Sequence, residues 1–287
     1  MNLNGRRKTN NFDDRRGRSG SGMKLAGGGI AGILIALAVA FFGGGGDLGS
    51  ILSMVQSPAT TSGDTYTPTA EEEALADFSK QVMASTEDVW TEIFRQNGLE
   101  YEAPTLVLYS GSTTSGCGQA DASVGPFYCS ADESVYIDLS FFQNMPRDLG
   151  AGGDFTFAYV IAHEVGHHVQ HLLGTLDRTH AKMQQVGETQ ANKLSVCLEL
   201  QADFYAGVWA FHENRLFSSI EPGDIEEAVD AASKIGDDYL QQRARGYTVP
   251  DSFNHGTSAQ RMQWLQLGLQ TGDLRRGDTF SALGQQL

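Results

Sequence analysis

The sequence predicts an α+β protein: a mainly helical domain with a small β-sheet or hairpin region, preceded by one N-terminal transmembrane helix. Three patterns lead to this fold class. Apolar residues recur at helical spacing after residue 69 and again from about residue 154. Short runs of β-branched and aromatic residues, separated by Gly, Ser and Asp, lie between these two regions. An unbroken apolar stretch occupies residues 25–42.

Charge is divided unevenly along the 287 residues. Residues 1–24 hold seven Lys or Arg and two Asp, a net charge of +5, whereas the whole chain carries −15. The remaining residues therefore carry −20. Binding to nucleic acid needs clustered Lys and Arg against the phosphates. The acidic remainder of the chain therefore argues against nucleic acid as a partner of the folded body.

The apolar stretch is long enough for a membrane span. Residues 25–42 are apolar or glycine, and a helix of that length is about 27 Å long. With Gly43 to Gly46 it would reach about 33 Å, so we expect a transmembrane helix over residues 25–46. A cleaved signal peptide and a buried helix are the alternatives. The bases before the stretch predict a single-pass cell-membrane protein with residues 1–24 in the cytoplasm and the body outside it.

A linker and then the folded domain follow. Residues 47–68 are rich in Gly, Ser, Thr and Pro, as linkers are. We therefore expect the domain at residues 69–287. Thr69 and Glu72 form a capping-box pattern at the start of its first helix, and Gly98 predicts the end of that helix.

The β-type runs cover residues 105–109, 126–129 and 135–139. Cys117 and Cys129 flank one of the turns between them, and outside the cytoplasm we expect a disulfide that fixes this hairpin. Two unpaired thiols are the alternative. Cys197 has apolar neighbours, which indicates a buried thiol rather than a nucleophile.

The segment His163-Glu164-Val165-Gly166-His167 is an H-E-x-x-H motif in an apolar helical stretch. Residues four apart lie on one face of a helix, so the imidazoles of His163 and His167 can reach a single Zn²⁺. Glu164 lies about 100° around the helix, where its carboxylate can act as a base on water beside the metal. The motif therefore predicts a catalytic zinc site.

The third ligand must lie elsewhere in the chain. A metzincin would have Gly and His where this sequence has Gln170 and Leu173, so that class is excluded. His171 continues the histidine stripe, but its backbone is about 12 Å from His163 along the helix axis, too far for one tetrahedral ion. We expect His168 and His171 on the surface or in support of the ligands.

Glu199 and Asp203 are four residues apart in a second long helical segment whose other residues are largely apolar or small. A carboxylate in such surroundings is partly buried and needs a partner or a metal. Glu199 would complete a His₂Glu site, and Asp203 would accept a hydrogen bond from a ligand imidazole and hold its tautomer. The alternative is a solvated acidic face.

These motifs resemble the gluzincin pattern, H-E-x-x-H followed by E-x-x-x-D on a later helix. The chain is more closely similar to the putative neutral zinc metallopeptidase family of bacterial membrane-anchored proteins. The resemblance extends over nearly the whole chain and rests on GRR and DRRG, the glycine-rich apolar span, HEVGHHVQ, LELQAD with AGVWA, and HGTSAQR. It implies a zincin-like domain, a Zn²⁺ cofactor and a peptide or protein substrate.

The resemblance also implies how the residues act. Glu164 would be the general base, and a His, Tyr or Arg beyond the second ligand helix would stabilise the oxyanion. His255 is our candidate for that role and Arg261 the second; His255 as a residue at a helix entry is the alternative.

We therefore expect a membrane-anchored zinc metallopeptidase whose β-hairpin region binds an extended peptide as an added strand. One alternative function is a non-catalytic zinc-binding scaffold of the cell envelope. The other is a zinc hydrolase acting on a non-protein envelope polymer.

Overall fold

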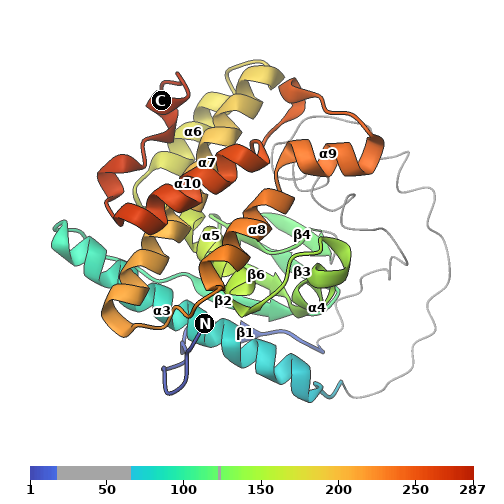
Figure 1. Cartoon of the computed structure of the whole chain (residues 1–287), viewed down its shortest axis with the longest axis vertical. Helices are drawn as coiled ribbons and strands as arrows, with labels where there is room; N and C mark the ends of the chain where they lie inside the picture. The colour runs from blue at the N-terminus through green and yellow to red at the C-terminus, as the bar shows by residue number, and fades with distance from the viewer. Residues whose placement is uncertain (18–65, 122–123) are drawn as a thin grey trace.

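The computed structural model describes residues 1–17, 66–121 and 124–287 (Figure 1). Its first part contains the strands and two helices: β1 (Phe12–Asp14), α3 (Ala70–Gln96), β2 (Thr105–Tyr109), β3 (Ser112–Ser115), β4 (Gly118–Asp121), β5 (Phe127–Cys129), β6 (Ser134–Asp138) and α4 (Leu139–Asp148). Its second part is helical: α5 (Asp154–Leu172), α6 (Thr175–Met183), α7 (Glu188–Phe217), α8 (Asp224–Lys234), α9 (Asp237–Arg245), η1 (Pro250–Ser252), α10 (Ser258–Thr271), η2 (Leu274–Arg276) and α11 (Thr279–Ala282). The predicted mainly helical α+β class is confirmed.

The main sheet has four strands in the order β1-β2-β6-β5. Strands β1, β2 and β6 run parallel, with Leu106 opposite Val135, and β5 pairs antiparallel to β6. The residues of β6 are all buried. Strands β3 and β4 form a separate antiparallel hairpin. The structure joins Cys117, in the turn of this hairpin, to Cys129 at the end of β5 by a disulfide.

Helix α3 begins as the capping pattern predicts. The Thr69 hydroxyl accepts a hydrogen bond from the Glu72 backbone N–H at 3.1 Å, and the Glu72 carboxylate accepts one from the Thr69 backbone N–H at 2.7 Å. Both orphan donors at the helix start are therefore satisfied. Apolar residues at helical spacing, Val82, Val89 and Ile93, face the core.

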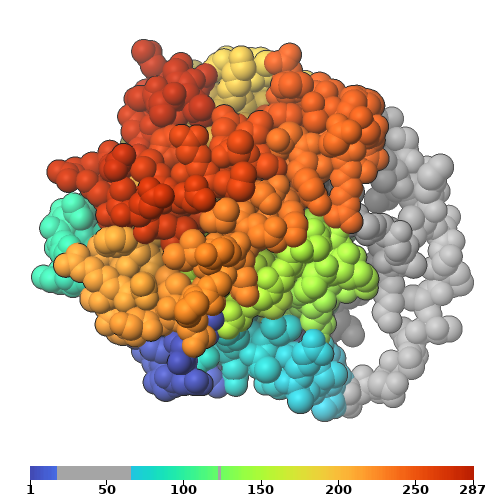
Figure 2. Space-filling view, in the orientation of Figure 1, coloured from blue at the N-terminus to red at the C-terminus, as the bar shows by residue number. Residues whose placement is uncertain are grey.

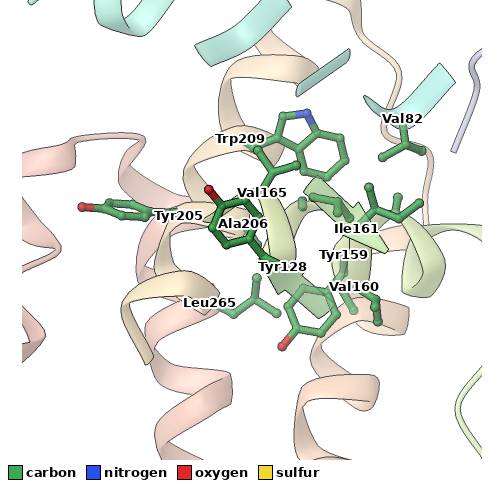
Figure 3. Packing of buried hydrophobic residues seen from close by; sticks show 14 of the residues in the cluster. Val82, Tyr128, Tyr159, Val160, Ile161, Val165, Tyr205, Ala206, Trp209 and Leu265 are labelled. Carbon is green, nitrogen blue, oxygen red and sulfur yellow. The ribbon is translucent and has the colours of Figure 1, made fainter. Parts of the chain in front are cut away.

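Helices α5, α7 and α10 form the centre of the helical part. Val165 of α5, Ala206 and Trp209 of α7 and Leu265 of α10 are fully or almost fully buried in one core (Figure 3). Helices α7 and α10 approach most closely where Gly207 faces Gly268. A methyl group on either glycine would overlap the backbone of the facing helix. The two glycines therefore set the distance between these helices.

The N-terminal residues are part of the folded body. Strand β1 hydrogen-bonds to β2, the Asn2 backbone N–H donates to the Ser219 carbonyl at 2.7 Å, and Leu3 is buried in the core. Figure 2 shows this segment packed between α3 and the chain that follows α7. Its bases bind acids of α3: Arg7 lies 2.8 Å from Glu87. Further ion pairs are Arg6 with Asp88 and Lys8 with Asp77.

The predicted location, a single-pass membrane protein with residues 1–24 in the cytoplasm and the body outside, is wrong. One crossing between residues 17 and 66 would place the two on opposite sides of the membrane, whereas residues 1–16 are hydrogen-bonded to the body. The expected span at residues 25–46 lies outside the described residues. Within the described part of the chain, no helix combines the length and apolarity that a membrane crossing needs.

We expect Gly268→Ala to lower the free energy of unfolding by about 1–3 kcal/mol or more, because the added methyl group forces α7 and α10 apart. Urea unfolding followed by circular dichroism measures the change. Gln266→Ala, at an exposed position of the same helix, is the matched control and should change stability by less than about 0.5 kcal/mol. Equal stability of the two variants would contradict this packing.

Candidate metal centre

Helix α5 carries the H-E-x-x-H motif against α7. Gly166, inside the motif, faces the backbone of Ala202, and a Cβ atom at Gly166 would lie 3.0 Å from the Ala202 carbonyl oxygen. The missing side chain lets the two helices approach closely. His163 and His167 of α5 therefore meet residues of α7 on either side of Ala202, Glu199 and Asp203.

Three ligand-type groups converge at this crossing. His163 Nε2 lies 3.2 Å from Glu199 Oε2, and His167 Nε2 lies 3.5 Å from Glu199 Oε1. One ligand atom from each residue falls within 4.8 Å of the others. Zinc binds His nitrogen and carboxylate oxygen at about 2.0–2.2 Å, so two ligands of a tetrahedral ion stand about 3.3–3.5 Å apart. The donor types and their spacing therefore fit a zinc ion.

The other ring nitrogens of both histidines have partners. His163 Nδ1 donates to Asp203 Oδ1 at 2.8 Å, and His167 Nδ1 donates to Gln170 Oε1 at 2.9 Å. Gln170 is itself held by its amide, which donates to the Leu198 carbonyl at 2.7 Å. With Nδ1 bound in each ring, Nε2 is the ring atom that faces Glu199 and would bind a metal ion. The support that Gln170 gives to His167 was not predicted, because Gln170 is itself held by the carbonyl of Leu198, 28 residues away in the sequence.

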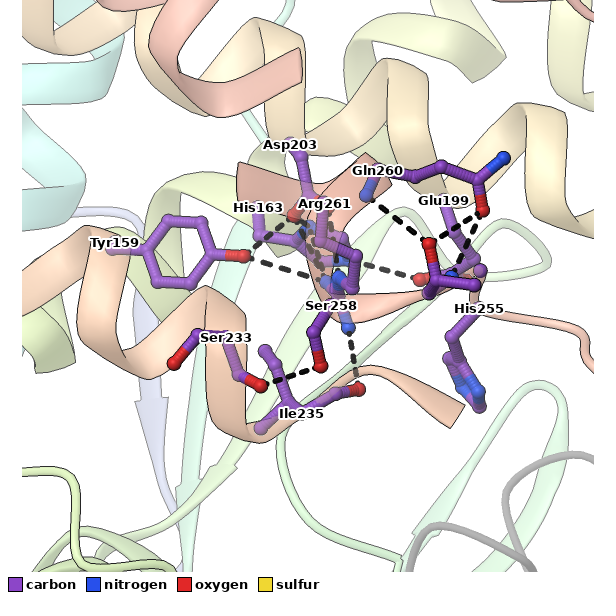
Figure 4. Close-up of polar contacts among 12 residues, drawn as sticks. Tyr159, His163, Glu199, Asp203, Ser233, Ile235, His255, Ser258, Gln260 and Arg261 are labelled. Atoms are coloured by element: carbon purple, nitrogen blue, oxygen red, sulfur yellow. Dashed lines mark hydrogen bonds and ion pairs between the residues drawn. The ribbon is translucent and has the colours of Figure 1, made fainter. Parts of the chain in front are cut away.

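Asp203 is the centre of a buried polar network (Figure 4). Besides His163, its carboxylate accepts hydrogen bonds from the Tyr159 hydroxyl at 2.6 Å and from Arg261 Nε and Nη2 at 2.8 and 2.9 Å. Burial favours the neutral acid, but the charges of Arg261 and His163 lower the pKa of Asp203 to about 2. Arg261 thus neutralises Asp203, a role different from the oxyanion contact for which it was a second candidate.

The electrostatics differ between the two histidines. Burial alone would lower the pKa of His163, but Asp203 and Glu199 raise it to about 10. Burial lowers the pKa of His167 to about 4. The Glu199 carboxylate keeps its charge despite burial, because His167 and His163 lower its pKa. In the metal-free state the cluster therefore holds a proton on His163, which an entering metal ion would displace.

Glu164 lies in the same cavity as these three residues and is 9% exposed. Burial, with a contribution from the charge of Glu199, raises the pKa of Glu164 to about 7, although His163 opposes the shift. The backbone N–H of Tyr128, in β5, donates a hydrogen bond to this carboxylate. A carboxylate with a pKa near neutrality is suited to proton transfer at neutral pH.

His255 reaches the cavity from the loop between η1 and α10. Asp237, at the start of α9, holds this loop: its Oδ2 accepts the backbone N–H groups of Asn254, His255 and Gly256 at 2.8, 2.7 and 3.0 Å. Its Oδ1 accepts a hydrogen bond from His255 Nδ1 at 3.1 Å. Burial opposes protonation of His255, but Asp237 and Glu199 raise its pKa. The helix that follows, α10, begins at Ser258 and is capped by Thr257.

The remaining histidines of the motif region lie outside the cluster. His168 is fully buried: its Nε2 donates to the Glu102 carbonyl at 2.6 Å, and its Nδ1 accepts from the Tyr128 hydroxyl at 3.0 Å. His171 lies 3.3 Å from Asp177. His168 therefore connects α5 to β5, the strand beside the cavity.

Comparison with known proteins agrees with this geometry. Residues 1–280 match the family described as "Putative neutral zinc metallopeptidase". The chain belongs to this family. "Uncharacterized protein YpfJ" of Escherichia coli (strain K12) is 45% identical over 288 residues, which cover 98% of this chain and 99% of the relative. "Uncharacterized protein Rv2575" of Mycobacterium tuberculosis is 45% identical over 192 residues, 63% of this chain and 64% of the relative. No solved structure matches the chain.

Membership of this family implies zinc. Among the described residues, His163, His167 and Glu199 form the cluster that joins two imidazoles to a carboxylate. A second group consists of three acids, Asp154, Asp224 and Glu227, without a histidine or cysteine. The amino group of Met1 lies 2.8 Å from Asp154 and 3.0 Å from Asp224, so these carboxylates already face a positive charge. The His/Glu cluster is therefore the candidate zinc site.

His168 makes stability depend on pH. Burial lowers its pKa from 6.5 to about 4, so between these values the unfolded state binds the proton and the folded state does not. Stability from this group is full above pH 6.5 and falls as the pH falls toward 4. From pH 7 to pH 4.5, we expect wild type to lose about 2–3 kcal/mol more than His168→Gln, which cannot titrate. Urea unfolding of both proteins without metal measures this; equal losses would contradict the buried neutral imidazole.

Proposed function

We propose that the protein is a zinc-dependent peptidase that hydrolyses peptide bonds with Glu164 as its general base. One observation carries the proposal. Two imidazole nitrogens and a carboxylate converge at zinc-ligand spacing, and a buried carboxyl group with a pKa near 7 opens into the same cavity. A closed structural zinc site has no use for such a base.

The residues would hold the ion through His163 Nε2, His167 Nε2 and Glu199. A bound zinc ion would supply a Lewis acid that acidifies water and polarises a carbonyl oxygen. Glu164 then takes a proton from the attacking water and later delivers it to the departing amine, so the base is regenerated as the C–N bond breaks. Asp203 and Gln170 hold both imidazoles in the tautomer that leaves Nε2 free.

We infer that His255 donates a hydrogen bond to the carbonyl oxygen of the substrate as negative charge develops there. Its Nδ1 is bound by Asp237, so Nε2 is the atom available to the cavity that His255 shares with Glu164 and Glu199. Asp237 and Glu199 favour the protonated, donating ring. Three backbone N–H groups of the loop donate hydrogen bonds to the Asp237 carboxylate and so hold the loop in position.

Strand β5 offers a place for the substrate backbone. It pairs with β6 at the edge of the main sheet, and Gly125, Pro126, Phe127 and Tyr128 line the cavity. An edge strand can pair with an extended peptide, whose main chain then lies along the sheet. The hydrogen bond between Tyr128 and His168 holds this strand beside α5, and the disulfide from Cys129 to Cys117 joins it to the β3–β4 hairpin.

We expect Glu164→Gln to retain one zinc per chain and to lower the rate of peptide hydrolysis by about 10²–10⁴-fold, because only the proton transfer is lost. Glu199→Ala should instead lose zinc affinity. Metal analysis and a peptide-mixture cleavage assay followed by mass spectrometry measure both. Glu226→Gln, at an exposed position of α8, is the control. A zinc-loaded wild type that cleaves nothing beyond what Glu164→Gln cleaves would refute the proposal.

We expect His255→Ala to lower kcat by about 10²–10³-fold with little change in KM, because a donor to the developing charge acts mainly in the transition state. Asp237→Asn should also lower kcat, because an amide at this position orients His255 less well than the carboxylate. Zinc content should stay at wild-type level in both variants. His171→Ala, outside the cluster, serves as control. A change confined to KM would assign His255 to substrate binding instead.

A further inference from the structure

The cavity beside the candidate zinc site is lined by two sets of residues, which we call its polar wall and its apolar wall. One wall carries the polar groups already described. The other is built from apolar side chains of four helices and the loop after α4: Phe141, Met145, Leu149, Val160, Leu176 and Leu198. Met145, Leu149 and Leu198 are at most 2% exposed, whereas Phe141 is partly exposed. A cavity with such an apolar lining and a few polar groups is typical of a ligand-binding pocket.

The size of the cavity limits what can enter it. The whole cavity, with the part beside the candidate zinc site, has a volume of about 130 Å³. An apolar protein cavity of about 150 Å³ holds one benzene molecule. The cavity therefore has room for no more than one branched aliphatic side chain or phenyl ring, and a polar side chain would carry polar atoms to the apolar residues without partners.

The charges of the lining also limit the occupant. Among the described residues that line it, Glu164, Glu199 and Arg261 are the Asp, Glu, Lys or Arg residues, and each belongs to the polar wall. Arg261 is already bound to Asp203. His180, near Leu176, has its pKa lowered by burial and so is neutral. A charged substrate side chain would therefore lose its hydration beside the apolar wall without gaining a counter-charge.

We propose that this pocket binds a large apolar side chain, such as Leu, Met or Phe, next to the scissile bond of an extended peptide. The inference rests on the proposed peptidase function and adds its substrate class. With the peptide main chain along β5, successive side chains point to opposite faces of the sheet, so the residue beside the scissile bond can point toward the helices that carry the apolar wall. The pocket thus selects the residue beside the bond that is cut.

A binding experiment tests the pocket independently of catalysis. Zinc-loaded Glu164→Gln is titrated by calorimetry with capped pentapeptides Ala-Ala-X-Ala-Ala, where X is Leu, Phe, Ser or Asp. We expect the Leu and Phe peptides to bind at least 10-fold more tightly than the Ser and Asp peptides, as burial of several methylene groups requires. Equal binding of all four peptides would overturn the inference.

Two substitutions add to this test. Leu176→Trp fills the pocket and should abolish the preference for Leu and Phe, whereas Arg178→Trp, exposed on the same helix, should leave it intact. Phe141→Ala widens the mouth and should shift the preference toward X = Trp, which keeps the test valid if Leu176→Trp does not fold. A preference unchanged by folded Leu176→Trp and by Phe141→Ala would place the apolar contact elsewhere and refute the pocket.

Cleavage by wild type separates this inference from the proposed function. Cleavage sites flanked by large apolar residues support both. Cleavage without an apolar preference, together with equal binding, refutes the pocket and leaves the peptidase proposal standing. If zinc-loaded wild type cleaves no peptide, the peptidase proposal fails, and the calorimetric series still decides whether the pocket binds apolar side chains.

Discussion

The carboxylate of Asp203 is fully buried on α7 and joins three helices at one point. It accepts hydrogen bonds from Tyr159 and His163 of α5 and from Arg261 of α10. A buried charge is costly unless every lone pair finds a donor and the charge finds its opposite. The relative positions of α5, α7 and α10 must therefore satisfy this one group. The orientation of the His163 ring, and with it the direction of Nε2, follows from the same contact.

Close packing of the helix backbones lets the side chains of this network reach one another. Gly166 brings α5 against Ala202 of α7, and Gly207 brings α7 against Gly268 of α10. At these separations the side chains of one helix reach those of the next, so the ligand-type groups lie 3.2 to 3.5 Å apart. The spacing that suits a zinc ion is thus a property of helix packing, which glycine permits and the buried ion pair of Asp203 with Arg261 orients.

The apolar residues that line the cavity affect both its apolar and its polar part. Apolar side chains on one wall exclude water and offer a surface for a substrate side chain. They also favour the neutral form of Glu164, whose pKa lies near 7. Strand β5 closes the cavity on the side of the sheet and is held there by the hydrogen bond of Tyr128 with His168, while the disulfide joins it to the β3–β4 hairpin. The proposed base Glu164, the proposed donor His255 and the apolar residues therefore share one low-dielectric space, where electrostatic interactions are stronger than in water.

Local periodicity by itself determined several features of this protein. The 3.6-residue repeat places His163 and His167 on one helix face, the four-residue spacing and apolar flanks select Glu199 and Asp203, and the Thr69 pattern begins α3.

Contacts between distant segments were decided only by tertiary structure. Strand β1 lies in a polar, basic segment with no strand pattern and forms because β2 offers its edge. The roles of Gln170, Asp237 and Arg261 depend on partners far along the chain or on a loop conformation. The N-terminal bases, which suggested a membrane topology, instead neutralise acids of α3. The sequence gives the number and order of the charged residues, whereas the fold decides which opposite charge each of them pairs with.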